Sequence, residues 1–142
     1  MGSRNAVGAL VAVATLAAAS AAADPCQAIS DKGPLPAWLS RGSTFRGPVV
    51  YVGDGDSLCV AVGAGAANWV EVRLADFYAP EIREPAGPAA KAALERLAMG
   101  RQTECRADHR SYDRIVARCA IAGHSIGDLL RAAGVQEGGR GQ

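Results

Sequence analysis

Short runs of alternating apolar and polar residues are the feature that most constrains how this 142-residue chain can fold. The clearest run, WVEVRL at residues 69–74, places aliphatic side chains on one face of an extended strand and Glu71 and Arg73 on the other. The sequence Gly-Asp-Gly-Asp at 53–56 is a strong turn signal between two further runs. The pattern predicts five short strands, at residues 45–52, 57–62, 69–74, 102–107 and 115–122.

Two other segments have the spacing of a helix. Pro88 begins the first, good helix formers fill residues 89–99, and Gly100 ends it. The pattern also predicts a shorter second helix at residues 127–133. The order of three strands, helix, two strands and helix is that of an OB-fold, a five-stranded barrel with a helix between strands 3 and 4. We therefore predict a mainly β (α+β) fold of this type, in one globular domain.

Both ends of the chain are expected to lie outside this domain. Arg4 precedes an uncharged run that ends in three alanines, which is the pattern of a secretory signal cleaved after Ala23; an uncleaved membrane anchor is the alternative. Cleavage implies a periplasmic or secreted protein that is free of the membrane. We divide the chain into a signal peptide (1–23), an irregular arm rich in Pro, Gly and Ser (24–44), the domain (45–135) and a flexible tail (136–142).

All four cysteines follow the predicted signal, an even number in an oxidising compartment. Cys105 and Cys119 flank a polar turn between two predicted strands, which favours their pairing. Cys26 is then left for Cys59, a bond that would tie the arm to the domain. Three pairings are possible in principle, and four unpaired thiols are the alternative.

The charge balance limits the functions that the chain can have. The formal net charge is +1, and loss of Arg4 with the signal leaves equal numbers of basic and acidic residues. This balance argues against binding of nucleic acid through bulk positive charge, so any phosphate chemistry must come from locally placed groups. Three polar clusters are candidates, although each one alone also fits an ordinary polar turn or loop: residues 54–57 (DGDS), 73–81 (RLADFYAPE) and 112–114 (YDR).

Taken together and in order, these clusters resemble the staphylococcal nuclease (thermonuclease) family over about residues 48–135. The resemblance lies in DGDS, then VRLA-x-x-x-APE, a helix, Y-x-R-x-VA-x-C, and a short helix that ends in AGV. It implies an exported OB-fold nuclease that hydrolyses phosphodiester bonds of DNA and RNA with calcium and with low sequence specificity. By position, Arg73 and Arg114 match arginines that contact the scissile phosphate, Glu81 matches the glutamate that positions or deprotonates water, and Tyr112 matches a tyrosine near the nucleotide phosphate.

The metal site departs from the pattern of the family. Asp56 matches the first calcium ligand, and Asp54 matches an acid behind it. Tyr78 stands where a second calcium-binding aspartate is usual, and a neutral phenol is a poor calcium ligand. Asp76, two residues earlier, is the candidate to replace that carboxylate. Asp113 stands where the family has glycine, and it would either pair with Arg114 or hold it away from phosphate.

The sequence therefore predicts a monomeric, exported, metal-dependent nuclease, with a divalent cation, most simply Ca²⁺, and nucleic acid as substrate. The alternative is a catalytically weakened or inactive OB-fold module that binds an anionic ligand or a protein partner. A third interpretation is a disulfide-stapled structural domain. Tyr78 and Asp113 favour the weakened or inactive binding module, and the retained Asp56, Arg73, Glu81 and Arg114 favour the nuclease.

Overall fold

The computed structural model describes residues 1–2 and 23–138. The predicted signal peptide therefore lies almost wholly outside the described residues, as does the end of the predicted tail. Residues 23–43 contain no helix or strand, as expected for the arm, and the arm is anchored through the fully buried Leu39. No helix in the described ranges is long and apolar enough to cross a membrane.

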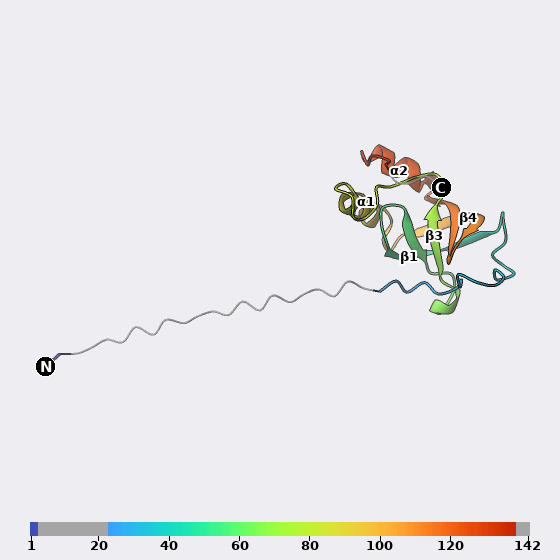
Figure 1. Ribbon diagram of the computed structural model, residues 1–142, viewed down its shortest axis with the longest axis horizontal. Coiled ribbons are helices and arrows are strands. Elements are labelled where there is room, and N and C mark those ends of the chain that lie inside the picture. Colours follow the sequence, from blue (N-terminus) through green and yellow to red (C-terminus); the bar gives the residue numbers. More distant parts are fainter. Residues whose placement is uncertain (3–22, 139–142) are drawn as a thin grey trace.

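One six-stranded sheet forms the body of the molecule (Figure 1). Its strand order is β3-β2-β1-β4-β5-β6, and these neighbours pair antiparallel. In addition, β3 pairs in parallel with β5, in the register Val72 to Ile115, so that the first five strands close on themselves. The strands are β1 (Thr44–Val52), β2 (Ser57–Val60), β3 (Val70–Leu74), β4 (Gln102–Ser111), β5 (Arg114–Ile121) and β6 (His124–Ser125).

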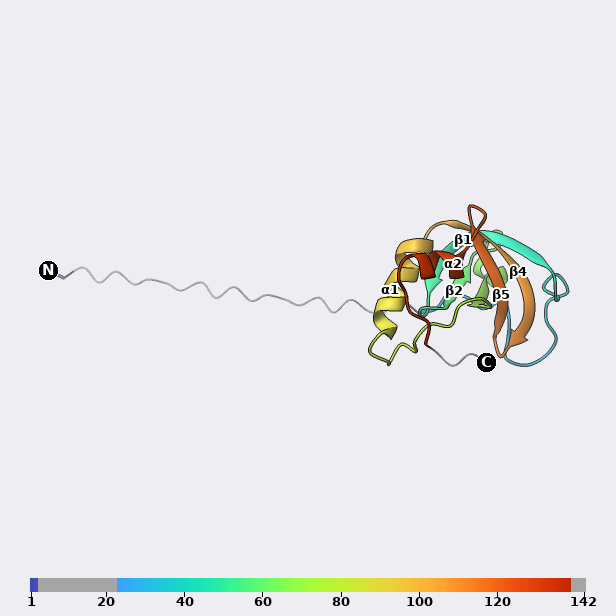
Figure 2. The same ribbon diagram turned by 90° about the horizontal axis from the view of Figure 1, so that it is seen from above.

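Two α-helices accompany the sheet, which confirms a mainly β fold of the α+β class. In chain order, α1 (Gly87–Ala98) follows β3 and precedes β4, and α2 (Ile126–Ala132) follows β6. A short 3-10 turn, η1 (Ala66–Asn68), lies between β2 and β3. Figures 1 and 2 show α1 and α2 side by side at one end of the sheet.

The apolar pattern of the sequence determines the core. In β3, Val70, Val72 and Leu74 are fully buried, while Glu71 and Arg73 are half-buried on the opposite face, as the alternation predicts. The helices bury their apolar stripes against the same core, with Leu94 from α1 and Leu130 from α2 both fully buried. At about 25 cal/mol per Å² of apolar surface, burial of such side chains is the main source of stability.

Strand ends were predicted less well. The sequence pattern ended β4 near residue 107, because the charged run 108–111 breaks the apolar alternation, but β4 continues to Ser111. Pairing with β5 supports this extension, and a bulge at Asp108 absorbs one extra residue. The two-residue β6 was not predicted, since so short a strand has no periodicity to detect.

Both predicted disulfides are present, and they account for all four cysteines. Cys105 and Cys119 are directly opposite on β4 and β5, and their Cα atoms lie 4.1 Å apart. The bond between Cys26 and Cys59 joins the arm to β2 across a sequence separation of 33 residues. Two disulfides fit a location outside the cytoplasm.

We predict that each disulfide contributes about 2–4 kcal/mol to the free energy of unfolding, because each restricts the unfolded chain. The paired substitutions Cys26→Ala with Cys59→Ala, and Cys105→Ala with Cys119→Ala, should each lower the denaturation midpoint in urea. Alanine avoids the burial of a new hydroxyl group at Cys59 and Cys105, which are fully buried. An unchanged midpoint in either variant would contradict this prediction.

Candidate functional site

The turn between β1 and β2 is held tightly against the rest of the domain. The Gly53 amide donates to the Ser57 carbonyl oxygen at 3.0 Å, and Asp54 Oδ1 accepts from the Asp56 amide at 3.0 Å. A Cβ atom on Gly55 would lie 2.5 Å from the Ala79 Cβ and 2.7 Å from the Ala90 Cβ. Glycine is therefore required at this position for the turn to pack on both α1 and the segment that follows β3.

Asp56 is the central side chain of this turn and is only 5% exposed. Its Oδ2 accepts from the Ala79 amide at 2.9 Å, and its carbonyl oxygen accepts from the Leu74 amide at 2.8 Å. Burial, followed by the charge of Asp54, raises the pKa of Asp56 to about 6, although the Ala79 hydrogen bond and Arg73 act in the opposite direction. Asp56 thus links the turn to the segment that leads to Glu81.

The sheet brings the two predicted phosphate-contacting arginines to one face. Arg73 is paired with Ser57 of β2 on one side and with Val116 of β5 on the other. One residue earlier than the Val72–Ile115 pair, the same parallel register places Glu71 beside Arg114. The charge of Arg114 acts on Glu71, which agrees with this placement. We call the face of β3 and β5 that carries Glu71, Arg73 and Arg114 the outer face.

Glu81 lies in the exposed loop between β3 and α1. Its amide donates to Glu84 Oε2 at 2.8 Å, and a Cβ atom on Gly87 would lie 2.0 Å from its carbonyl oxygen. The first turn of α1 therefore packs directly on the Glu81 backbone. Because Glu81 is two residues after Ala79, its Cα lies within about 8 Å of the residue that binds Asp56.

Asp76 forms a hydrogen bond with the residue that precedes α2. Its Oδ2 accepts from Ser125 Oγ, and a Cβ atom on Gly127 would be 2.9 Å from its carboxyl carbon. Its backbone carbonyl oxygen accepts from Arg131 Nη2. Its buried Oδ1 has no hydrogen-bond partner among residues 23–138. These contacts are separate from those of Asp56, so the carboxylate faces α2 in this arrangement.

The predicted metal ligands do not converge on one point in the described part of the chain. There, the only group of three possible ligand atoms within 4.8 Å of one another comes from Asp24, Cys26 and Cys59. Those two cysteines form a disulfide and offer no thiolate, the form that binds metals. Asp54 and Asp56 are two carboxylates of one turn, and carboxylate oxygens are the donors that a hard cation prefers.

Tyr78 stands where the resemblance predicts an aspartate. Its backbone forms hydrogen bonds with the C-terminal segment. Its amide donates to Glu137 Oε1 at 3.3 Å, and its carbonyl oxygen accepts from the Gly138 amide at 3.0 Å. Arg131 pairs with Glu137 at 3.0 Å and lowers the pKa of that carboxyl group. The described residues 136–138 of the predicted flexible tail are thus held by hydrogen bonds in this structure.

The third cluster forms the turn between β4 and β5. Tyr112 is 77% exposed and has a φ of 56°, which is unusual for a tyrosine. Its carbonyl oxygen accepts from Arg110 Nε at 2.8 Å. The next residue, Asp113, is exposed, and its charge acts on Glu71. The turn therefore presents a phenol ring and a carboxylate next to Arg114.

Glu71 is the one site residue that the sequence did not single out. Burial is the largest cause that raises the pKa of Glu71 to about 7, followed by the charges of Asp24 and Asp113. Arg114 acts in the opposite direction. In the sequence, the alternation of apolar and polar residues indicates only that Glu71 is on the polar face of its strand. The proximity of the arm and of the β4–β5 turn, which creates the acidic surroundings, has no local signal in the sequence.

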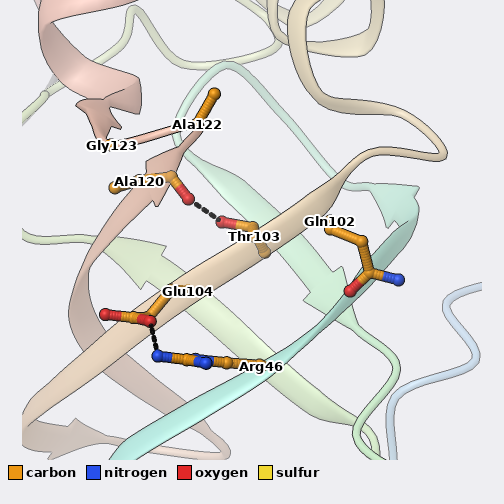
Figure 3. A pocket seen from close by; sticks show the side chains of 7 residues that line it. All are labelled: Arg46, Gln102, Thr103, Glu104, Ala120, Ala122 and Gly123. Carbon is orange, nitrogen blue, oxygen red and sulfur yellow. Dashed lines mark hydrogen bonds and ion pairs between the residues drawn. The ribbon is translucent and has the colours of Figure 1, made fainter.

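A hollow of about 330 Å³ lies elsewhere, over β1, β4 and the β5–β6 turn (Figure 3). Thr103 Oγ1 donates to the Ala120 carbonyl oxygen at 2.9 Å, and Arg46 is ion-paired with Glu104. Thr103, Arg46 and Glu104 are thus already partnered, and none of the predicted site residues lines the hollow.

Comparison with protein-family models and with curated proteins found no match for this chain. Assignment of a function therefore depends on the residues and geometry described above.

We predict that Glu71→Gln stabilises the protein at pH 8 and has little effect at pH 4. The folded state holds the Glu71 proton up to a pKa of about 7, against an ordinary value of 4.5. The stabilisation due to this proton is complete below pH 4.5 and is lost as the pH rises through about 7. The melting temperature of the variant relative to wild type, measured across this range, tests this expectation.

Arg114→Gln provides the matched opposite case, because it removes the charge that lowers the pKa of Glu71. This variant should lose more stability at pH 8 than at pH 4. A Glu71→Gln effect that is the same at both pH values would be inconsistent with the proposed surroundings of Glu71.

Proposed function

We propose that this protein is an exported, metal-dependent nuclease that hydrolyses phosphodiester bonds of DNA or RNA with low sequence specificity. The observation that carries the proposal is the pairing of β3 with both β2 and β5. This pairing sets Arg73 next to the buried Asp56 turn and sets Arg114 on the same face as Arg73. We expect the protein to act as a monomer, in the periplasm or after secretion.

We also propose that the fold is an OB-fold barrel with α1 between its third and fourth strands. The parallel β3–β5 pairing, which closes the order β3-β2-β1-β4-β5, supports this assignment. So does the position of α1 after β3 and before β4 in the chain. The fold alone does not define an activity, since OB-folds have many functions.

In the proposed reaction, the two arginines bind the scissile phosphodiester. A guanidinium group presents a planar set of donors and stays protonated, so Arg73 and Arg114 would neutralise the charge that develops on the phosphate oxygens. Glu81, on an exposed loop, would accept a proton from the attacking water. The water oxygen then forms a bond to phosphorus, the bond from phosphorus to one ester oxygen breaks, and that ester oxygen takes up a proton from solvent water.

Asp56, together with Asp54, is the proposed holder of the divalent cation. When bound, the cation would polarise a phosphate oxygen as a Lewis acid. Two adjacent carboxylates, one of them buried and with a raised pKa, repel each other, and a bound cation relieves that repulsion. Asp76 remains a predicted ligand only if its carboxylate turns away from Ser125, with which it interacts in this structure.

A second candidate function is a non-catalytic module that binds an anionic ligand or a protein partner. The engagement of Asp76 by Ser125 favours it, because the carboxylate expected to replace the missing ligand is already occupied. The neighbouring Asp113 also favours it, since a carboxylate next to Arg114 competes with phosphate for the guanidinium.

We expect purified protein that begins at Asp24 to cleave single-stranded DNA or RNA only when Ca²⁺, Mg²⁺ or Mn²⁺ is present. Arg73→Ala and Glu81→Ala should each lower kcat about 100- to 1,000-fold, the typical cost of removing one group that stabilises the transition state. Arg101→Ala and Glu95→Ala remove the same charges near the end of α1 and serve as matched controls. Binding without cleavage by the wild type would support the second candidate function.

We also predict that Asp56→Asn lowers the affinity for Ca²⁺ by at least about tenfold in a calorimetric titration, because it removes the buried carboxylate from the turn. Glu95→Gln, on α1, is the control for loss of one negative charge. Loss of affinity in Asp76→Asn would assign Asp76 as a further ligand, whereas full affinity would leave it as the partner of Ser125. Equal affinity in wild type and Asp56→Asn would refute the metal site.

A further inference from the structure

Two exposed arginines that have no role in the site assigned above face each other on the outer face of the sheet. Arg106 of β4 and Arg118 of β5 are a directly opposed cross-strand pair. The Cβ atoms of such a pair lie about 4.5–5.5 Å apart, and like charges at this position destabilise a sheet. A groove of about 150 Å³ lies between them, lined also by Ala107 and Asp108.

Neither of these guanidinium groups has an ion-pair or hydrogen-bond partner among residues 23–138. The neighbouring arginines differ, because Arg41 pairs with Asp108 at 2.9 Å and Arg46 pairs with Glu104. Asp108, the acid in the groove, is also bound to His109, and these contacts lower its pKa. The Arg106–Arg118 pair is thus a local excess of positive charge in a chain whose overall charge is nearly balanced.

The pair is continuous with the candidate site. The bulge in this part of the sheet lies on β4, so alternation along β5 is unbroken, and Arg114, Val116 and Arg118 share the outer face. Arg73 is paired with Val116. Strand spacing of about 4.8 Å and a rise of about 3.3 Å per residue then place the Arg118 Cα about 8 Å, and the Arg106 Cα about 12 Å, from that of Arg73.

We propose that Arg106 and Arg118 form a phosphate-binding subsite that extends the Arg73–Arg114 site along a single strand of nucleic acid. The pair is close enough for both guanidinium groups to bind one phosphate. Its separation from Arg73 corresponds to about two to four phosphates at the stacked spacing of about 3.4 Å. A polyanion with regularly repeated charges fits this geometry. The subsite rests on the proposed nuclease function.

The subsite is tested first by binding alone, with a fluorescein-labelled 12-nucleotide single-stranded DNA in EDTA, so that no cleavage occurs. The double variant Arg106→Gln, Arg118→Gln should bind about tenfold more weakly than wild type in 50 mM salt, as measured by anisotropy. Its plot of log affinity against log salt should be less steep by about 0.7, the value for one phosphate of a single strand that is no longer neutralised. The control, Arg96→Gln with Arg101→Gln, removes the same charge from the region of α1.

A second measurement separates the subsite from the nuclease function. The ratio of kcat/KM for the 12-nucleotide DNA to that for a chromogenic nucleotide diester with one scissile phosphate should fall about tenfold in Arg106→Gln, Arg118→Gln. If wild type cleaves neither substrate, but only this variant loses binding, the subsite is supported and the nuclease function is not. Equal binding losses in the two double variants would overturn the subsite even if the wild type cleaves DNA.

The same titration with poly-glutamate of matched charge tests the identity of the ligand. Poly-glutamate that binds as tightly as DNA, with the same loss in the variant, would overturn the assignment to nucleic acid in favour of an acidic protein partner. The melting temperature of Arg106→Gln, Arg118→Gln should equal or exceed that of wild type, because the substitution removes a like-charge pair. Weaker binding is therefore not expected to result from unfolding.

Discussion

The parallel pairing of β3 with β5 is the interaction on which the rest of the structure depends. It closes the order β3-β2-β1-β4-β5, and it brings Arg73 and Arg114, which are distant in sequence, to one face. Without it, β3 would be an edge strand with unpaired backbone groups. On its other side, β3 is paired with β2, which begins immediately after the Asp56 turn. A single strand thus positions both the acidic and the basic parts of the candidate site.

Two carboxyl groups around this strand have surroundings that disfavour their charged form. Asp56 and Glu71 both have a raised pKa, and burial is the largest cause for each. A buried acid next to other acids is stabilised by a proton or by a cation. The Asp54–Asp56 turn offers two carboxylates to a divalent ion, whereas Glu71 offers one, so the turn is the more suitable of the two places for such an ion.

The sequence predicted five of the six strands and both α-helices from local patterns, and it also predicted the two disulfide pairs. Alternation of apolar and polar residues identified the buried face of β3. The expected oxidising compartment, and the turn between the strands that carry Cys105 and Cys119, identified the partner of Cys105. What it missed depends on contacts between distant segments. The direction of the Asp76 carboxylate depends on Ser125, and Glu137 and Gly138 form hydrogen bonds with the Tyr78 backbone. The acidic surroundings of Glu71 come from the arm and from the β4–β5 turn, neither of which has periodicity.

Near-neutral net charge does not prevent a protein from binding a polyanion, provided that its cations lack internal partners. Arg46 and Arg41 are paired with acids, so their charges have little effect at a distance. Arg106 and Arg118 are not paired within the described chain, and they lie on the same face as Arg73 and Arg114. Because field strength near a surface depends on local charge, Arg106 and Arg118 can attract phosphate where the bulk composition suggests no attraction. Affinity that arises in this way should be modest and strongly salt-dependent.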